Sequence, residues 1–186
     1  MLSVNTLGET GTMELEDSIG YWLSYALRYF TSALFEVIRT HCVERGKPYV
    51  ITPLQWVVLA LLSRCDRQTI RTLAKLLHLD GPAVTNLAKR LEQSGLVERV
   101  RSRADERFVE VRLSAEGRDI VRSLNPLVEQ FHQQVFSDAQ RQALIGHLQQ
   151  FIARVSLVAP DAGDRFGSLL EHPNAARNTN ERAERP

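Results

Sequence analysis

The sequence predicts a mainly α-helical (α+β) fold, in which long helices flank a compact unit of short helices and one β-hairpin. Three observations predict it. Apolar residues recur at helical spacing through most of residues 14–158, two runs within residues 96–113 alternate instead, and a glycine separates the two patterns. With 186 residues, 44% of them apolar, the chain can bury one domain core and still carry appendages.

Residues 79–113 organise the compact unit. Asp80 is the expected N-cap of a helix, because its carboxylate can accept hydrogen bonds from the free N–H groups of the first turn, and Gly95 is the expected residue that ends it. One face of this helix repeats apolar residues at i, i+3, i+4 and i+7, namely Val84, Leu87, Ala88 and Leu91. The opposite, polar face suits the major groove of DNA, whose floor offers donors, acceptors and thymine methyl groups. The candidate DNA-binding residues on this helix are Pro82, Thr85, Asn86, Lys89 and Arg90.

A hairpin with a basic turn follows the glycine. Residues 96–100 and 108–113 alternate as half-buried strands do, and the turn 101–107 between them holds three arginines and two carboxylates. A solvated loop of this kind can place an arginine in a narrow minor groove, although the loop alone also fits an ordinary charged hairpin tip. Helix, glycine and basic hairpin in this order predict a winged helix-turn-helix, with the hairpin as the wing. The candidate DNA-binding residues of the wing are Arg101, Arg103 and Arg107.

Two further helices complete the expected DNA-binding domain, residues 52–114. Thr52 and Gln55 form a capping box at the start of a helix that is apolar almost all round and is therefore expected to be central. Thr69 is the expected cap of a short helix over residues 70–77, the first half of the helix-turn-helix, and His78 lies in its turn.

Long helices are predicted on both sides of this domain. Residues 14–45 form the expected N-terminal dimerisation helix, whose apolar stripe is broader than one small domain can cover and so predicts contact with a partner chain. Residues 115–158 form the expected C-terminal dimerisation helices. Within them Pro126 is expected to kink or break the first helix, and Ser137 begins the last helix with a second capping box.

Asp105 and Arg107, followed by Leu113, Ser114 and Gly117, resemble the D-x-R…L-[ST]-x-x-G signature of the MarR (multiple antibiotic resistance regulator) family. The resemblance implies a homodimer in which the first helix and the last two helices interlock with those of a second copy. It also implies a ligand-responsive DNA-binding transcriptional regulator, a repressor that a small aromatic acid, phenolic or related thioester releases. A two-fold dimer with one reading helix per chain is expected to bind an inverted repeat in double-stranded DNA.

The effector site is expected between the first helix and the central domain, near Tyr25, Arg28, Tyr29 and Trp56. Arg28 would donate a charge-assisted hydrogen bond to a carboxylate, and the tyrosines would supply flat apolar walls. Three simpler interpretations stand beside this one: a rim of surface tyrosines, an Arg28 paired with a carboxylate, and a Trp56 that belongs to the core.

Charge and cysteine usage leave two other functions open. The net charge is only +1, but residues 64–112 hold eleven Lys/Arg against seven Asp/Glu, so the case for nucleic acid rests on local charge. Cys42 and Cys65 have arginines nearby and allow a redox-sensing repressor, although both also fit buried thiols. A winged-helix module that binds only proteins is the third class, against which the basic wing argues.

No catalytic or metal site and no cofactor are expected, because the chain lacks a glycine-rich phosphate loop and its five histidines are scattered. No signal peptide or membrane-spanning run is apparent, so the expected location is the cytoplasm. Residues 1–13 are expected to form a flexible leader and residues 161–186 a largely disordered tail.

Overall fold

The computed structural model describes residues 17–101 and 108–159. The predicted leader, the turn of the hairpin and the predicted tail lie outside these residues. Six helices and a small sheet follow one another in the order α1 (Ile19–Glu44), α2 (Pro53–Arg64), β1 (Gln68–Thr69), α3 (Ile70–Leu77), α4 (Gly81–Gln93), β2 (Val97–Arg101), β3 (Val109–Leu113), α5 (Ala115–Val135) and α6 (Asp138–Val158). The predicted mainly α fold with a winged helix-turn-helix and long flanking helices is confirmed.

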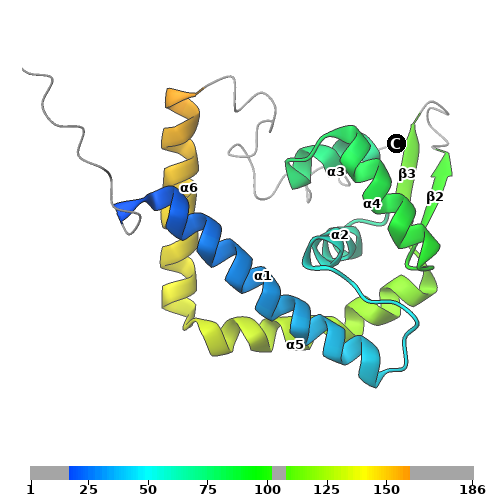
Figure 1. The fold of residues 1–186 in the computed structure, drawn as a ribbon. Helices are drawn as coiled ribbons and strands as arrows, with labels where there is room; N and C mark the ends of the chain where they lie inside the picture. Colours follow the sequence, from blue (N-terminus) through cyan, green and yellow to red (C-terminus); the bar gives the residue numbers. More distant parts are fainter. Residues whose placement is uncertain (1–16, 102–107, 160–186) are drawn as a thin grey trace, which may run out of the picture.

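The molecule has two sides that α5 connects (Figure 1). The central helices α2, α3 and α4 and the β2–β3 hairpin lie on one side, while α6 and the first half of α1 lie on the other. We call the first side, residues 51–114, the winged-helix unit. We call the first half of α1 together with α6 the arms.

Side-chain caps set most helix starts. The Asp80 carboxylate accepts from the Ala83 N–H at 2.7 Å, and Thr52 and Ser137 each begin a helix with a complete capping box, as the sequence predicts. The start of α1 differs from the prediction. The Ser18 hydroxyl accepts from the Tyr21 N–H with extended backbone at Ser18, so α1 begins at Ile19. Residues 14–16 of the predicted helix lie outside the described residues.

The three strands form an antiparallel sheet in the order β1-β3-β2. Val97 pairs with Leu113 at the base of the hairpin, and Arg101 pairs with Val109 near its turn. The sequence did not predict β1, because a two-residue strand is too short to show an alternating pattern.

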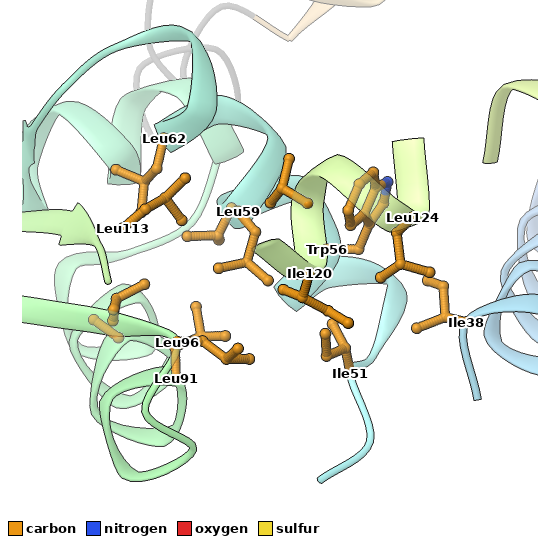
Figure 2. Close-up of a cluster of buried hydrophobic side chains, with 14 of the residues drawn as sticks. Ile38, Ile51, Trp56, Leu59, Leu62, Leu91, Leu96, Leu113, Ile120 and Leu124 are labelled. Carbon is orange, nitrogen blue, oxygen red and sulfur yellow. The ribbon is translucent and has the colours of Figure 1, made fainter. Parts of the chain in front are cut away.

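The core lies in the winged-helix unit and at its junction with α5. Figure 2 shows its larger members, which come from α1, α2, α4, β3 and α5, from the connector before α2 and from the turn before β2: Ile38, Ile51, Trp56, Leu59, Leu62, Leu91, Leu96, Leu113, Ile120 and Leu124. Only the C-terminal half of α1 takes part, through Leu34, Ile38 and Cys42.

The rest of the apolar surface of the long helices is exposed. On α1 it includes Trp22, Leu23 and Leu27, and on α6 it includes Leu144, Ile145, Leu148, Phe151, Ile152 and Val155. No residue of α6 is buried. These surfaces are the part of the predicted stripes that one chain leaves uncovered.

Pro126 does not break α5, which continues from Ala115 to Val135. The proline lies on the exposed side of the helix, where water can solvate the carbonyl of Arg122 that loses its usual N–H partner. In the described part of the chain, no helix is both long and apolar enough to span a bilayer.

Candidate nucleic-acid interface

Helix α4 presents a polar face to solvent. Pro82, Asn86, Lys89 and Arg90 are exposed and Thr85 is half-buried, so the structure brings the five predicted helix residues to one accessible surface. Neither Lys89 nor Arg90 forms an ion pair with another described residue, which leaves both cations available for phosphate or base edges. The Thr85 hydroxyl donates to the Gly81 carbonyl at 2.8 Å, so its oxygen and its methyl group remain for an outside contact.

The end of α4 is fixed to the base of the hairpin. Gly95 has a φ of 70°, the Leu96 N–H donates to the Leu91 carbonyl at 2.9 Å, and the Gly95 N–H donates to the Glu92 carbonyl at 2.8 Å. This is a Schellman motif, which confirms the predicted glycine stop. The Arg99 Nε then donates to Glu92 at 2.7 Å, across the turn from β2 to α4. Helix and wing are therefore held in one orientation.

The Arg99–Glu92 pair was not predicted. Its only signal in the sequence is a pair of opposite charges seven residues apart on either side of a helix-ending glycine. The two charges can be paired only when it is known that the turn at Gly95 brings β2 back alongside the end of α4.

The wing is described only at its base. Arg101 is exposed at the end of β2, which suits a contact with DNA, while the predicted DNA-binding residues Arg103 and Arg107 lie outside the described residues. Two contacts hold the base of the hairpin: Ser114 Oγ donates to the Gly95 carbonyl at 2.6 Å, and Arg112 pairs with Glu98 at 2.6 Å.

A polar network joins the end of α1 and the following connector to the first turns of α5. Arg45 pairs with Asp119 at 2.9 Å, and Glu116 accepts from Lys47 at 2.7 Å and from the Tyr49 hydroxyl. The hydrogen bonds from Lys47 and Tyr49 hold the pKa of Glu116 below its usual range. Burial, followed by the hydrogen bond to Glu116, raises the pKa of Tyr49. We call these contacts, together with the His41–Ser123 pair, the α1–α5 polar network.

His41 adds the last contact of this network. Its Nε2 lies 2.9 Å from Ser123 Oγ, and because that hydroxyl donates to the Ile120 carbonyl, Nε2–H is the donor to it. Burial and the neighbouring Arg45 lower the pKa of His41 below 6.5. The network joins the end of α1 and the following connector to the first turns of α5, and the sequence did not predict it.

The four predicted effector residues separate into two groups. The side chains of Tyr25 and Tyr29 are 47% and 72% exposed, and their rings stack at 6.2 Å on the same half of α1 as Arg28. Trp56 is only 6% exposed and belongs to the buried cluster with Ile38 (Figure 2), which is the simpler of the two interpretations of Trp56. Ile38 lies ten residues beyond Arg28, about 15 Å along the helix. The described single chain therefore does not gather all four around one pocket.

The two thiols differ in environment. Cys42 is fully buried, and burial raises its pKa, whereas a redox-sensing thiol needs an accessible sulfur and a lowered pKa. Cys65 is half-buried between Arg64 and Asp66. Within residues 17–101 and 108–159, no three His, Cys, Asp or Glu side chains gather in a way that could hold a metal ion.

Comparisons with known proteins agree with this geometry. Residues 51–109, the winged-helix unit as far as the wing, match the model of the MarR family. The HTH-type transcriptional regulator SarZ of Staphylococcus epidermidis is 28% identical over 120 residues, which are 64% of this chain and 80% of SarZ.

Two solved structures share the fold. One is BpsR of Bordetella bronchiseptica, whose DNA binding is regulated by 6-hydroxynicotinic acid; it is 24% identical, has a TM-score of 0.64, and the match covers 76% of this chain and 97% of BpsR. The other is a mutant MarR from E. coli complexed with operator DNA, 24% identical with a TM-score of 0.57 over 69% of this chain and 92% of that one.

Proposed function

We propose that this chain is a transcriptional regulator of the MarR family, a homodimeric repressor that binds an inverted repeat in double-stranded DNA and leaves it when a small aromatic acid, phenolic or related thioester binds. The observation that carries the proposal is the outer face of α4. It combines exposed short polar groups with two cations that have no ion pair among the described residues, on a helix that the Arg99–Glu92 pair joins to the base of the hairpin.

The exposed arms support the homodimer. Their apolar side chains are arranged along whole helices, and a second copy of the same helices is the simplest cover for them. A two-fold dimer would present two copies of α4 to half-sites about one helical turn apart. Sedimentation at micromolar protein concentration tests this proposal, since a monomer that binds its operator as a monomer would refute it.

Binding to DNA is tested with an operator recovered by selection from random sequence. Lys89→Ala should weaken binding to every sequence and lower the salt slope by about 1 if Lys89 contacts phosphate. It should cost about 1–3 kcal/mol at one base pair if Lys89 reads a base edge. Arg154→Ala on α6 is the matched control, because Arg154 is also an exposed cation without an ion pair among the described residues.

The wing is tested in the same assay. Arg107→Ala should lower operator affinity while leaving the unfolding transition unchanged, because the sequence predicts a charged turn at this position and replacing one surface charge changes stability little. If neither Lys89→Ala nor Arg107→Ala changes the affinity or its salt dependence, the winged helix does not bind DNA through this surface.

We propose that the effector binds against the exposed half of α1, at Tyr25, Arg28 and Tyr29. The simplest competing interpretation paired Arg28 with a nearby carboxylate, but Glu36 pairs with Arg39 at 2.7 Å and Arg28 has no ion pair in the described parts of the chain. A guanidinium without an ion pair among the described residues, on the same half of α1 as two stacked tyrosines, suits an aromatic carboxylate. This surface lies on the arms, so a ligand here can alter how the two DNA-binding units are spaced.

The effector proposal is tested with 6-hydroxynicotinic acid, benzoate and a benzoyl thioester as probes for release of the operator. A hundredfold loss of DNA affinity requires about 2.7 kcal/mol of coupling between the two sites. Arg28→Ala should weaken effector binding while operator affinity is kept, and Arg39→Ala on the same helix should change neither. A full effector response in both Arg28→Ala and Tyr25→Ala would place the pocket elsewhere.

A further inference from the structure

Helix α3 carries a second exposed basic surface next to α4. Arg71 and Lys75 are both exposed and lie four residues apart, so they project from the same side of the helix. The opposite side packs against the core through Leu73, which is fully buried. We call Arg71 and Lys75 the α3 basic face. The surfaces proposed above for DNA and for the effector do not include it.

The charge of the α3 basic face is not compensated within the part of the chain that the structure describes. Residues 67–79 contain no Asp or Glu, and neither Arg71 nor Lys75 forms an ion pair with another described residue. By contrast Arg67, just before the helix, lies 3.5 Å from Glu110 of β3. Like charges four residues apart destabilise an isolated helix, so the fold itself gains nothing from this pair. The pair therefore indicates an anion outside the chain.

The turn after α3 fixes this helix against α4. His78 takes the left-handed conformation with a φ of 52°, and the Leu79 N–H donates to the Ala74 carbonyl at 3.1 Å. Helix α4 begins directly afterwards, at Gly81. In Figure 1, α3 and α4 lie on one side of α2 and α5 lies on the other. Where the second helix of a helix-turn-helix enters the major groove, the first helix crosses the DNA backbone. A duplex bound by α4 would therefore bring phosphates to α3.

We propose that the α3 basic face binds the sugar–phosphate backbone of the operator beside the groove that α4 enters. The inference deepens the proposed function and rests on it, because it requires α4 to lie in the major groove. The Arg71 guanidinium can donate two hydrogen bonds to one phosphate, and the Lys75 ammonium lies about one helical turn, or 5.4 Å, further along. Such contacts carry no sequence information. They fix the register and orientation in which the side chains of α4 meet the bases.

The test is operator binding by the purified full chain, measured over a series of salt concentrations. Arg71→Gln/Lys75→Gln should weaken binding about tenfold or more at about 0.1 M salt and lower the salt slope by about 2 for each bound chain. The loss should be equal for the selected operator and for its single-base variants, because phosphates are common to all of them. Arg122→Gln/Arg154→Gln is the matched control. It removes two exposed cations from α5 and α6, neither of which has an ion pair among the described residues, and should change neither quantity.

Two further measurements show whether the contact is to phosphate. Neutral methylphosphonate linkages, placed one at a time in the operator, should weaken binding of the unmodified protein at the contacted positions and should have no further effect there on Arg71→Gln/Lys75→Gln. Arg71→Lys/Lys75→Arg keeps both charges and should keep the salt slope. Thermal unfolding should be the same in all variants, because the substituted side chains are exposed.

The proposal fails if Arg71→Gln/Lys75→Gln leaves the affinity and the salt slope unchanged, in which case an acidic protein surface becomes the better partner for the α3 basic face. It also fails if the loss is confined to one base pair, or if the control variant loses as much. Absence of operator binding by the unmodified protein would refute the proposed function as well. A response to Lys89→Ala without one to Arg71→Gln/Lys75→Gln would refute only the role of α3.

Discussion

The helices of the winged-helix unit and those of the arms are alike in having side-chain caps, but they differ in how much of their apolar surface is buried. In the winged-helix unit α2, α3 and α4 each place apolar side chains in a common core that a single chain completes. In the arms α6 is longer, with 21 residues, and well capped, yet none of its residues is buried. The contrast shows that local helix signals and core formation are separate properties, and that the arms depend on burial from outside their own chain.

The largest expected difference comes from one substitution made in each region. Leu91→Ala removes a fully buried side chain of α4 and should cost about 2–5 kcal/mol of unfolding free energy, at any protein concentration. Leu148→Ala on α6, where the leucine is 38% exposed, should cost little in the single chain and should instead weaken the dimer. Urea unfolding at two protein concentrations distinguishes the two effects. An equal, concentration-independent loss in both variants would contradict the comparison.

The next effect concerns two helical glycines. A Cβ on Gly117 would lie 1.9 Å from the Leu96 carbonyl oxygen, so Gly117→Ala must push α5 away from the winged-helix unit and should destabilise it by about 1–3 kcal/mol or more. Gly146 on α6 has nothing within 4 Å of the same position, so Gly146→Ala should stabilise its helix by about 0.5–1 kcal/mol. Thermal unfolding of the two variants measures the expected loss of stability in Gly117→Ala and the expected gain in Gly146→Ala. A destabilising Gly146→Ala would sharpen the comparison by showing that the partner chain packs closely against α6.

A smaller effect is expected at the helix caps. Asp80→Ala removes the acceptor for the Ala83 N–H and should cost about 1 kcal/mol, because α4 is part of the core and its fraying is coupled to global unfolding. Ser137→Ala removes the equivalent bond in α6, whose loss should appear as local fraying. Hydrogen exchange of the first-turn amides, compared with the global unfolding free energy, tests this. Equal global losses would mean that α6 unfolds together with the winged-helix unit.

The smallest effect is a pH dependence of the junction between the two regions. The pKa of His41 is lowered in the folded state, so His41 contributes stability that is present above its unfolded pKa of 6.5 and is lost as the pH falls through the folded pKa. Glu116, whose pKa is also lowered, contributes in the same direction below pH 4.5. Unfolding free energy should therefore fall on acidification from pH 7, and His41→Gln should flatten the part of the curve just below pH 6.5. An unchanged curve in His41→Gln would exclude His41 as the titrating group.

The sequence determined the features whose causes lie within a few residues. The Asp80 cap, the Gly95 stop and the alternation of the two long strands each depend on groups that are neighbours along the chain, so their residue types and spacing were sufficient to predict them. The polar face of α4 followed from helical periodicity alone. The family resemblance rested on the same stretch, where residue types and their spacing are enough to carry it.

Only the tertiary structure decided what lies between elements that are distant in sequence. The pairing of Arg45 with Asp119 and the approach of Gly117 to the Leu96 carbonyl both require α5 to pack across segments that precede it. The same packing placed Trp56 in the core and left Arg28 without an ion pair in the described chain. Sequence periodicity shows which face of a helix is apolar, but which partner covers that face depends on the free energy of packing the elements together.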